Sequence, residues 1–512
     1  MKAKIFINKG LLSFFSTFFL NESIIYGAEK TIEVQKNIVE NKSLADDSSE
    51  RSVYNNARKF VVMISTKAYL TADSWSGNTS SWKGSGFILN KEKGLIATNK
   101  HVVGELSVST YDIKFHDGTV LPATYVYADP IYDFAIIKVD PKKIPESAAQ
   151  GELDTEPLKV NEAIYSIGNS AGDEFSVHKG IVFSTFENLG PFSEQSFQFS
   201  GVTVGGASGS PVIGENNKIK GILYGGKFVS GAGLPIAYIT RILKSVENEK
   251  EAKRFTTGAI FEYLTASDAL EANLLSKEDY DLYKNKFKDA QDKIISVSTR
   301  VVNSPAFDTL KPGDIILNIN EKLVGPELLM IDEMIDHAGI CEEEINFTIL
   351  RDSKKIDVKI KPIPLILDSD FDFIQFAGAL WSDVSEKIRL KTGIPEGVLI
   401  LQTDATSAFH ELGGKHHWGM LNILVKRIDG KPLKNLKDLE NMIPDLLNKK
   451  NFIVEYINQD GYESKMSYER INDLFPRKIV IKYNKKFDTP KVYKRDPKSK
   501  EWDTKLIVLD GK

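Results

Sequence analysis

The chain has 512 residues, a formal net charge of −4, a hydrophobic content of 42% and a charged content of 27%. This length exceeds what one hydrophobic core usually serves, and the composition excludes a disordered or fibrous protein, so several globular domains are expected. The small net charge excludes a general attraction to nucleic acid or to anionic membranes. The single cysteine, Cys341, excludes disulfides within the chain and is expected to be a half-buried, unreactive thiol.

The first 28 residues resemble a secretory signal peptide. Lys2 and Lys4 give a basic start, residues 10–20 are uncharged and apolar, and Ala28 offers a small residue at a cleavage position. The apolar run is shorter than the ~20 residues that a spanning helix needs. We therefore expect an exported, periplasmic protein without a membrane span once residues 1–28 are removed; an uncleaved anchor is the alternative.

A β-rich domain follows a polar segment. Residues 29–52 are charged and are expected to form a linker that leads into a helix. From residue 53 onward, short apolar stretches alternate with glycine turns, which is typical of a β-barrel or sandwich. Residues 239–254 then have the period of a helix with one charged face. This pattern predicts a first domain over residues 53–254.

A histidine, an aspartate and a serine occur in this domain in that order. His101 follows an apolar strand, Asp133 stands at the start of another, and Ser208 lies in a glycine-rich run. A serine hydroxyl becomes nucleophilic when a base lies within hydrogen-bond reach and a third group orients that base. The order predicts Ser208 as nucleophile, His101 as base and Asp133 as orienting acid. Three other aspartates could orient the base instead of Asp133, but each has the sequence context of a turn or surface residue: Asp117, Asp129 and Asp140.

The run before Ser208 also predicts an oxyanion hole. Gly205 and Gly206 permit backbone conformations that other residues rarely adopt. They can turn the N–H groups of Gly206 and Ser208 toward one point, where the negative charge of an acyl-transfer intermediate develops. The sequence therefore assigns oxyanion binding to these two N–H groups.

Two other patterns imitate catalytic motifs. Residues 168–172 match G-x-S-x-G, but a strand-like stretch follows where the nucleophile elbow needs a helix. Residues 221–227 match most of a P-loop, but Phe228 replaces the closing Ser or Thr. Because no spaced Cys, His or acidic ligands occur either, we expect no ATP, no metal and no other cofactor.

The second half of the chain contains a weak internal repeat. Residues 310–324 and 419–433 each read as a turn, an apolar strand and a polar hairpin, followed by helices expected at 327–338 and 436–447. Such copies about a hundred residues apart predict two small domains of similar build. The lysine-rich residues 481–512 are expected to form a basic, solvated tail, with one or two strands as the alternative.

Residues 84–236 resemble the HtrA (Deg) serine proteases. The shared motifs are Gly-Ser-Gly-Phe at 84–87, Thr-Asn-Lys-His-Val-Val at 98–103, the aspartate segment at 129–138 and the serine run. The Ser-Gly-Ser-Pro at 208–211 is similar to that of fungal nuclear HtrA-like proteases. The family's usual serine motif, G-N-S-G-G-P, differs here at Ala207 and Ser210.

The resemblance implies a mainly β fold: a chymotrypsin-like double β-barrel followed by two PDZ-like α+β domains, at 256–364 and 368–480. It implies the same triad and oxyanion groups, and a specificity pocket for small or medium apolar side chains. It also implies loops that bind chain ends and a homotrimer. The segments concerned are 187–194 and 225–233 for the pocket, 261–264 and 376–379 for the loops, and Tyr54 and Phe60 for the trimer.

Together these features predict an ATP-independent serine endopeptidase that degrades unfolded or damaged polypeptides. The expected partners are such substrates, peptide C-termini at the PDZ-like domains and further copies of the chain, with no nucleic acid. The alternative is a non-catalytic chaperone or scaffold whose protease fold is idle. A third possibility is an adaptor that cleaves only after a peptide binds a PDZ-like domain.

Overall fold

The structure is a computed structural model. It describes residues 44–71, 80–104, 107–189, 193–201, 203–227, 229–367, 372–392, 394, 396–403, 407, 409, 423–458, 477–483, 488–496 and 501–506. The expected signal peptide, residues 1–28, lies outside them. By its internal contacts the chain divides into two units, residues 1–55 and 56–512. Helix α2 (Leu44–Ala57) starts inside the segment expected to be a linker, so that boundary was placed too late.

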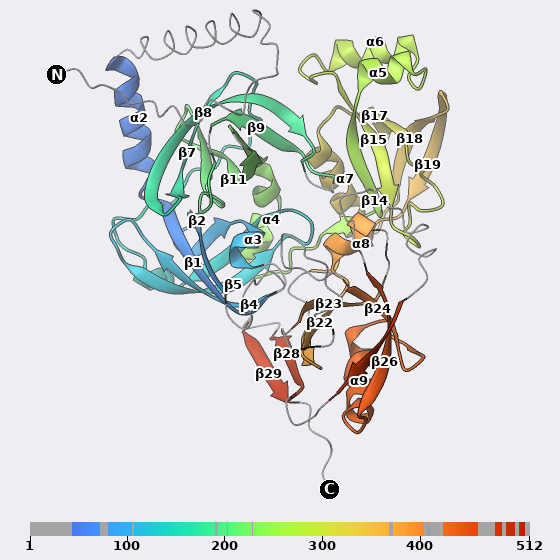
Figure 1. Ribbon diagram of the computed structural model, residues 1–512. Coiled ribbons are helices and arrows are strands. Elements are labelled where there is room, and N and C mark those ends of the chain that lie inside the picture. Colours follow the sequence, from blue (N-terminus) through green and yellow to red (C-terminus); the bar gives the residue numbers. More distant parts are fainter. Residues whose placement is uncertain are drawn as a thin grey trace, which may run out of the picture. The chain divides into compact units, whose positions relative to one another are not determined.

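The first barrel is closed by six antiparallel strands in the order β1-β2-β3-β6-β5-β4 (Figure 1). Along β4 the buried and exposed positions alternate, which is the pattern of a strand with one face in the core. A one-turn helix, α3 (Lys100–Val103), follows the third strand. The strands are β1 (Val61–Thr71), β2 (Ser80–Asn90), β3 (Leu95–Thr98), β4 (Ser107–Lys114), β5 (Val120–Ala128) and β6 (Ala135–Val139).

A short 3-10 helix, η2 (Pro141–Lys143), links the first barrel to the second, which closes in the order β10-β11-β12-β9-β8-β7. Its glycines leave room for aromatic rings: a Cβ on Gly231 would lie 2.2 Å from the ring of Phe199. Helix α4 (Ala237–Glu247) follows. The strands are β7 (Ala163–Ser170), β8 (Asp173–Glu187), β9 (Ser196–Ser200), β10 (Pro211–Gly214), β11 (Ile219–Lys227) and β12 (Ser230–Pro235).

The first small module is a sheet in the order β14-β15-β16-β18-β19, with the short β17 beside β16. Helix α7 packs Ile331 and Ile335 into its core. The elements are β13 (Phe255–Thr256), β14 (Ala259–Thr265), α5 (Ala266–Glu271), α6 (Lys277–Lys286), β15 (Lys293–Arg300), β16 (Ile315–Ile319), β17 (Lys322–Leu323), α7 (Leu328–Ile340), β18 (Ile345–Arg351), β19 (Lys354–Ile360) and β20 (Ile363–Pro364).

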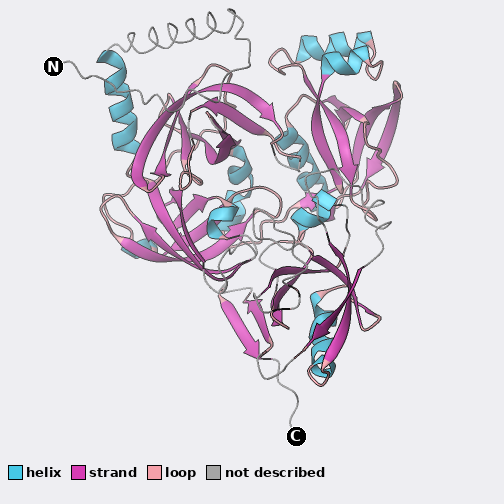
Figure 2. Cartoon of the chain, in the orientation of Figure 1, coloured by secondary structure: helices cyan, strands magenta, loops and turns pink. Residues whose placement is uncertain are grey.

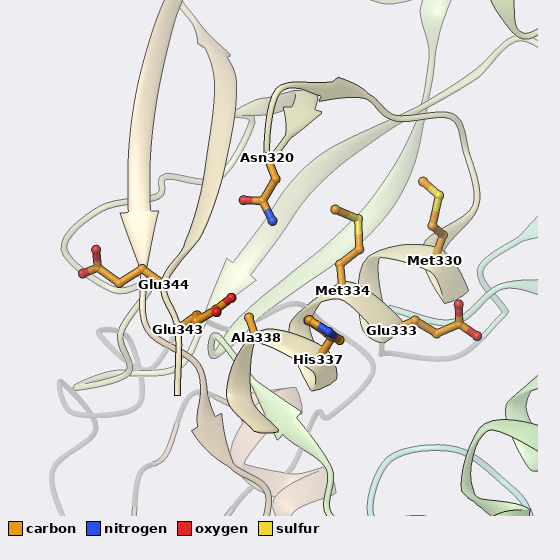
Figure 3. A pocket seen from close by; sticks show the side chains of 8 residues that line it. All are labelled: Asn320, Met330, Glu333, Met334, His337, Ala338, Glu343 and Glu344. Carbon is orange, nitrogen blue, oxygen red and sulfur yellow. The ribbon is translucent and has the colours of Figure 1, made fainter. Parts of the chain in front are cut away.

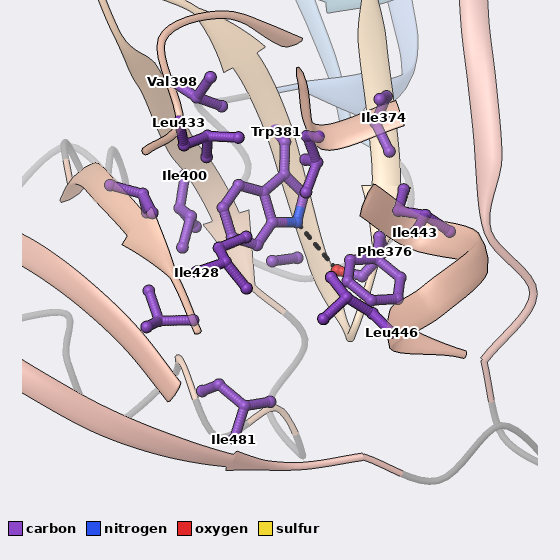
Figure 4. Packing of buried hydrophobic residues seen from close by; sticks show 14 of the residues in the cluster. Ile374, Phe376, Trp381, Val398, Ile400, Ile428, Leu433, Ile443, Leu446 and Ile481 are labelled. Carbon is purple, nitrogen blue, oxygen red and sulfur yellow. Dashed lines mark hydrogen bonds between the residues drawn. The ribbon is translucent and has the colours of Figure 1, made fainter. Parts of the chain in front are cut away.

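The second module is a sheet in the order β27-β26-β24-β23-β22-β21-β28-β29. Its core surrounds Trp381, whose indole N–H donates to the carbonyl of Phe376 at 2.9 Å (Figure 4). The elements are β21 (Phe373–Phe376), β22 (Ala379–Asp383), α8 (Glu386–Thr392), β23 (Val398–Thr403), β24 (Ile423–Ile428), β25 (Lys431–Pro432), α9 (Leu436–Leu446), β26 (Asn451–Asn458), β27 (Arg477–Lys482), β28 (Lys491–Arg495) and β29 (Trp502–Leu506).

The expected fold class is confirmed: strands dominate, and two closed barrels precede two further sheets with helices (Figure 2). The helices expected at 327–338 and 436–447 are α7 and α9. The helix expected at 239–254 ends instead at Glu247, and Glu249 takes a left-handed conformation with φ 52°. None of the described helices is long and apolar enough to cross a membrane.

The C-terminal tail contains structure that the lysine-rich sequence did not favour. Strands β28 and β29 form a hairpin, and β28 pairs with β21 of the second module. The Arg495 guanidinium lies 4.5 Å from the ring centre of Trp502 and 3.9 Å from that of Tyr125 in the first barrel. Stacking of this kind lets a cationic side chain contribute to packing. The alternative of one or two terminal strands was therefore correct.

Candidate active site

His101 and Asp133 meet at the edge of the first barrel. Helix α3 carries the histidine, and the loop between β5 and β6 carries the aspartate. The imidazole Nδ1 lies 2.6 Å from one carboxylate oxygen, and the His101 backbone N–H donates to the other at 3.0 Å. A carboxylate that holds both groups fixes the ring and points Nε2 away from itself. The side chain of His101 is 43% exposed, so the imidazole is accessible from solvent.

The loop that carries Asp133 is braced from inside. The Asp129 carboxylate accepts hydrogen bonds from the backbone N–H groups of Ile131 and Tyr132, at 3.0 and 2.9 Å. The buried Lys100 ammonium, next to His101, donates to the carbonyl of Asp129 at 2.9 Å. Asp129 was predicted as a turn or surface residue: it does lie in a turn, but its side chain is fully buried rather than at the surface.

Ser208 lies in the turn between β9 and β10, and its backbone is joined to the first barrel. Its carbonyl accepts from the backbone N–H of Ser85 at 2.8 Å, and the carbonyl of Ser85 accepts from the Thr98 hydroxyl at 2.7 Å. Thr98 ends the strand that leads into His101. Two hydrogen bonds therefore connect the predicted nucleophile's turn with the strand that precedes the predicted base.

The two departures from the usual serine motif are core residues. Ala207 is 4% exposed and belongs to an apolar cluster with Val212 and Leu223. Ser210 is fully buried, and its hydroxyl has no hydrogen-bond partner among the described residues. Both side chains therefore fill space beneath the turn, and neither changes the glycine at position 206.

The two stretches that match a nucleophile elbow and most of a P-loop are both part of the second barrel. Residues 168–172 end β7 and turn directly into β8, so a strand follows the motif, as expected. Ser170 nevertheless has an imidazole beside it: its Oγ lies 2.8 Å from Nε2 of His178. Residues 221–227 form part of the strand β11 rather than a phosphate loop. Among the described residues, no cluster of three or more His, Cys, Asp or Glu could hold a metal ion.

The segment expected to line a specificity pocket contains a buried acid. Glu194 is 5% exposed and accepts hydrogen bonds from the hydroxyls of Ser196 and Tyr224. Burial, and then the charge of Glu194, raise the pKa of Tyr224, so its hydroxyl stays protonated and donates. This cluster was not predicted, because an isolated glutamate in a loop is usually solvated.

Of the two loops expected to bind chain ends, one is part of a regular strand and the other is a tight turn between two strands. Residues 261–264 lie within strand β14, and the N–H of Phe261 donates to Ser193 Oγ at 2.7 Å. Residues 376–379 form the tight turn between β21 and β22, with φ values of 54° and 68° at Ala377 and Gly378. Strand β21 pairs with β22 and so covers that edge of β22.

A charged cluster joins the first barrel to the first small module, and the sequence did not reveal it. Arg254 is 1% exposed in its side chain and forms ion pairs with Asp129 and with Asp336 of α7, the latter at 2.8 Å. Arg241 lies 3.4 Å from Asp332, which also accepts from the hydroxyl of Tyr132. Burial by itself would raise the pKa of Asp129, but Arg254 and Arg241 outweigh it and hold that pKa low.

Asp332 makes this cluster sensitive to pH. Burial raises its pKa from 3.8 to about 6, against the opposing attraction of Arg241 and Arg254. A carboxyl with a raised pKa contributes most stability below its unfolded value, and this contribution is lost as the pH rises through about 6. We expect the unfolding free energy of the native chain, relative to Asp332→Asn, to fall by about 2–3 kcal/mol between pH 4 and 7.

Urea unfolding at each pH measures this difference, and Glu333→Gln, an exposed neighbour on the same helix, is the control. A difference between the native chain and Asp332→Asn that stays constant over this range would contradict the prediction.

A cavity of about 240 Å³ lies on α7 in the first small module, away from the groups above (Figure 3). Met330, Met334 and His337 of the helix face it, together with Glu343 and Glu344 from the segment before β18. Cys341 follows this helix and is exposed, so the expectation of a half-buried thiol was wrong. Phe60, expected near a trimer contact, is 6% exposed in the single chain.

Comparison with known proteins gives a consistent result. A family model described as a trypsin-like peptidase domain matches residues 84–222. The pro-apoptotic serine protease NMA111 of Kluyveromyces lactis is 24% identical over 503 residues, which are 94% of this chain and 48% of that protein. The protein of the same name from Debaryomyces hansenii is 25% identical over 496 residues, 90% and 47% of the two chains. The chain thus spans about half the length of the curated relatives it matches.

Two solved structures have lower sequence identity to the chain than these relatives. The HtrA-type protease AlgW with a decapeptide has a TM-score of 0.44 and 19% identity, covering 62% of this chain and 99% of that one. The serine endoprotease from Yersinia pestis has a TM-score of 0.41 and 19% identity, covering 62% and 98%. Residues 84–222 of this chain thus match a trypsin-like peptidase domain, and most of the chain is similar to fungal serine proteases of the name NMA111.

Proposed function

We propose that the chain is a serine endopeptidase with His101, Asp133 and Ser208 as its triad. The observation that carries this proposal is the imidazole of His101, held by the Asp133 carboxylate at 2.6 Å. It is supported by the backbone links from the Ser208 turn to Ser85 and Thr98. An idle scaffold was the alternative because of Ala207 and Ser210, and the burial of these residues beneath the turn gives that alternative no support.

In the proposed reaction, Nε2 of His101 takes the proton of the Ser208 hydroxyl as Oγ attacks the peptide carbonyl. Asp133 stabilises the imidazolium without taking its proton. The N–H groups of Gly206 and Ser208 donate to the oxyanion. The imidazolium then protonates the leaving amine, which departs and leaves an acyl-enzyme. Water, deprotonated by the same imidazole, releases the acid and regenerates Ser208. These steps use only groups of the chain and water, so the proposed hydrolysis is independent of ATP.

The proposed substrates are unfolded or damaged polypeptides, as the family resemblance implies. The side chains of Asn188 and Ser193 bond to the backbone of Phe261 and would compete with any peptide added to β14. We propose peptide C-termini as ligands of the first module only, because β21 covers the corresponding edge of the second. A homotrimer and an exported, periplasmic location remain proposals, tested by analytical ultracentrifugation and by sequencing the N-terminus of the mature protein.

Covalent labelling tests the proposed nucleophile directly. We expect a fluorophosphonate to inactivate casein cleavage by the native chain, without ATP, and to add one phosphonyl group. Peptide mapping by mass spectrometry should place that group on Ser208, because only an activated serine reacts. Labelling of Ser170 instead, or casein cleavage that survives complete labelling of Ser208, would contradict the proposal.

A further inference from the structure

The backbone turn before Ser208 is oriented by a neighbouring hairpin. The carbonyl of Gly205 accepts a hydrogen bond from the N–H of Ala171 at 2.8 Å. Because the C=O and N–H of a trans peptide point in opposite directions, this bond sets where the N–H of Gly206 points. Gly206 has φ +96°, and a Cβ there would lie 2.0 Å from the carbonyl oxygen of Asn169. The 168–172 turn, an imitation of a catalytic motif in the sequence, thus supports the turn of Ser208.

The next peptide is held by a side chain of the first barrel. The Ser85 hydroxyl donates to the carbonyl of Gly206 at 2.8 Å and accepts from the N–H of Asn169 at 2.8 Å. Ser85 is fully buried, and its own backbone N–H donates to the carbonyl of Ser208. One residue of β2 therefore bonds to the turn immediately before the nucleophile and to the nucleophile itself.

We propose that Ser85 is a positioning residue of the oxyanion hole, an inference that rests on the proposed function. Its hydroxyl joins β2, the 168–172 turn and the Gly206 carbonyl, and so keeps the N–H groups of Gly206 and Ser208 aimed at one point. Glycine has no side chain to restrict rotation of the adjoining peptides. Without the hydroxyl, the Gly206 carbonyl loses its partner, and the Gly206–Ala207 peptide keeps only the 3.2 Å hydrogen bond from the Ala207 N–H to the carbonyl of Val204. Ser85 acts through Gly206 and does not touch the reacting atoms.

Steady-state kinetics of the full-length Ser85→Ala variant test this role, with a fluorogenic peptide taken from a casein site that the native chain cleaves. We expect kcat to fall about 10–100-fold, less than the ~10²–10³ that loss of an oxyanion donor costs, because both donors remain present. KM should change by less than about threefold, since the hydrogen bonds from the two backbone N–H groups to the oxyanion form in the transition state rather than in the ground state. The acid limb of the pH profile should not move, because the His101–Asp133 pair is unchanged.

Ser166→Ala is the matched control. Ser166 is a serine of β7 in the same domain, is 4% exposed, and forms none of the hydrogen bonds described above. We expect its kcat to equal that of the native chain. Ser85→Cys keeps the shape of the side chain with a larger atom and offers only a weak donor and acceptor, so its kcat should fall between the other two. This variant also provides the test if Ser85→Ala does not fold, as judged by its thermal unfolding.

The outcomes separate this inference from the proposed function. A Ser85→Ala kcat within about threefold of native, an equal loss in Ser166→Ala, or a rise in KM alone would overturn the positioning role. A kcat that falls only in proportion to the folded fraction would overturn it as well. If the native chain has no Ser208-dependent cleavage, both fail; if it cleaves and Ser85→Ala matches it, only the positioning role fails.

Discussion

Ser208→Ala is expected to lower kcat for casein-derived peptides by about 10⁶-fold, which leaves only slow background hydrolysis. The alanine retains the turn and the N–H of residue 208, so the oxyanion donors and the substrate contacts remain. Only the attacking oxygen is lost, and with it the acyl-enzyme. The measurement is release of a fluorogenic leaving group over hours, together with circular dichroism to establish that the variant is folded.

Ser170→Ala is the matched control for this experiment. Ser170 also has a histidine within hydrogen-bond reach, with its Oγ 2.8 Å from His178 Nε2, and it also stands in a glycine-containing motif. It is followed directly by a strand, so its carbonyl and N–H groups take part in a hairpin rather than an oxyanion turn. We expect native kcat within about threefold in this variant. The reverse result, loss with Ser170→Ala and activity with Ser208→Ala, would transfer the nucleophile to β7.

Arg254→Met is expected to lower the unfolding free energy by about 3–5 kcal/mol, the typical result of leaving one partner of a buried ion pair without the other. Asp129 is fully buried, and Arg254 is its nearest cation. Methionine preserves much of the arginine's apolar length but leaves the carboxylate with Arg241, whose nearest nitrogen is 4.0 Å away. Urea unfolding followed by tryptophan fluorescence measures the change.

Lys138→Met is the control, because the Lys138–Glu249 pair is exposed and such pairs contribute about 0–1 kcal/mol. Adding Asp129→Asn to Arg254→Met should restore part of the lost stability by removing the stranded charge. A single variant Arg254→Met that unfolds within about 1 kcal/mol of the native chain would contradict the assignment of a buried ion pair. Because Asp129 opens the loop that leads to Asp133, we also expect Arg254→Met to have a lower kcat than the native chain.

Local patterns were sufficient for much of the fold and for the principal candidate residues. Short apolar stretches between glycine turns predict barrel strands such as β6, and the internal repeat predicts the helices α7 and α9. The order His101, Asp133, Ser208 identified a pair that the fold brings within 2.6 Å. Gly206 was also recognised, because a left-handed conformation next to a nucleophile favours glycine.

What the sequence could not give are the contacts between segments far apart in the chain. Asp129 and Arg254 look solvated in isolation, and their burial is favourable only because the fold pairs them across a sequence separation of 125 positions. Ser85 looks like one residue of a motif, and its bonds to Gly206 and Asn169 exist only when the two barrels meet.

The sequence alone determined the fold class, the positions of helices such as α7 and α9 and which three side chains are the candidate triad, because these depend on local spacing. Only the tertiary structure decided which charges are buried and which sheet edges are covered. It also decided which hydroxyl bonds to the Gly206 carbonyl. These features depend on partners supplied by distant segments. Burial of a polar or charged group is unfavourable unless such a partner is present.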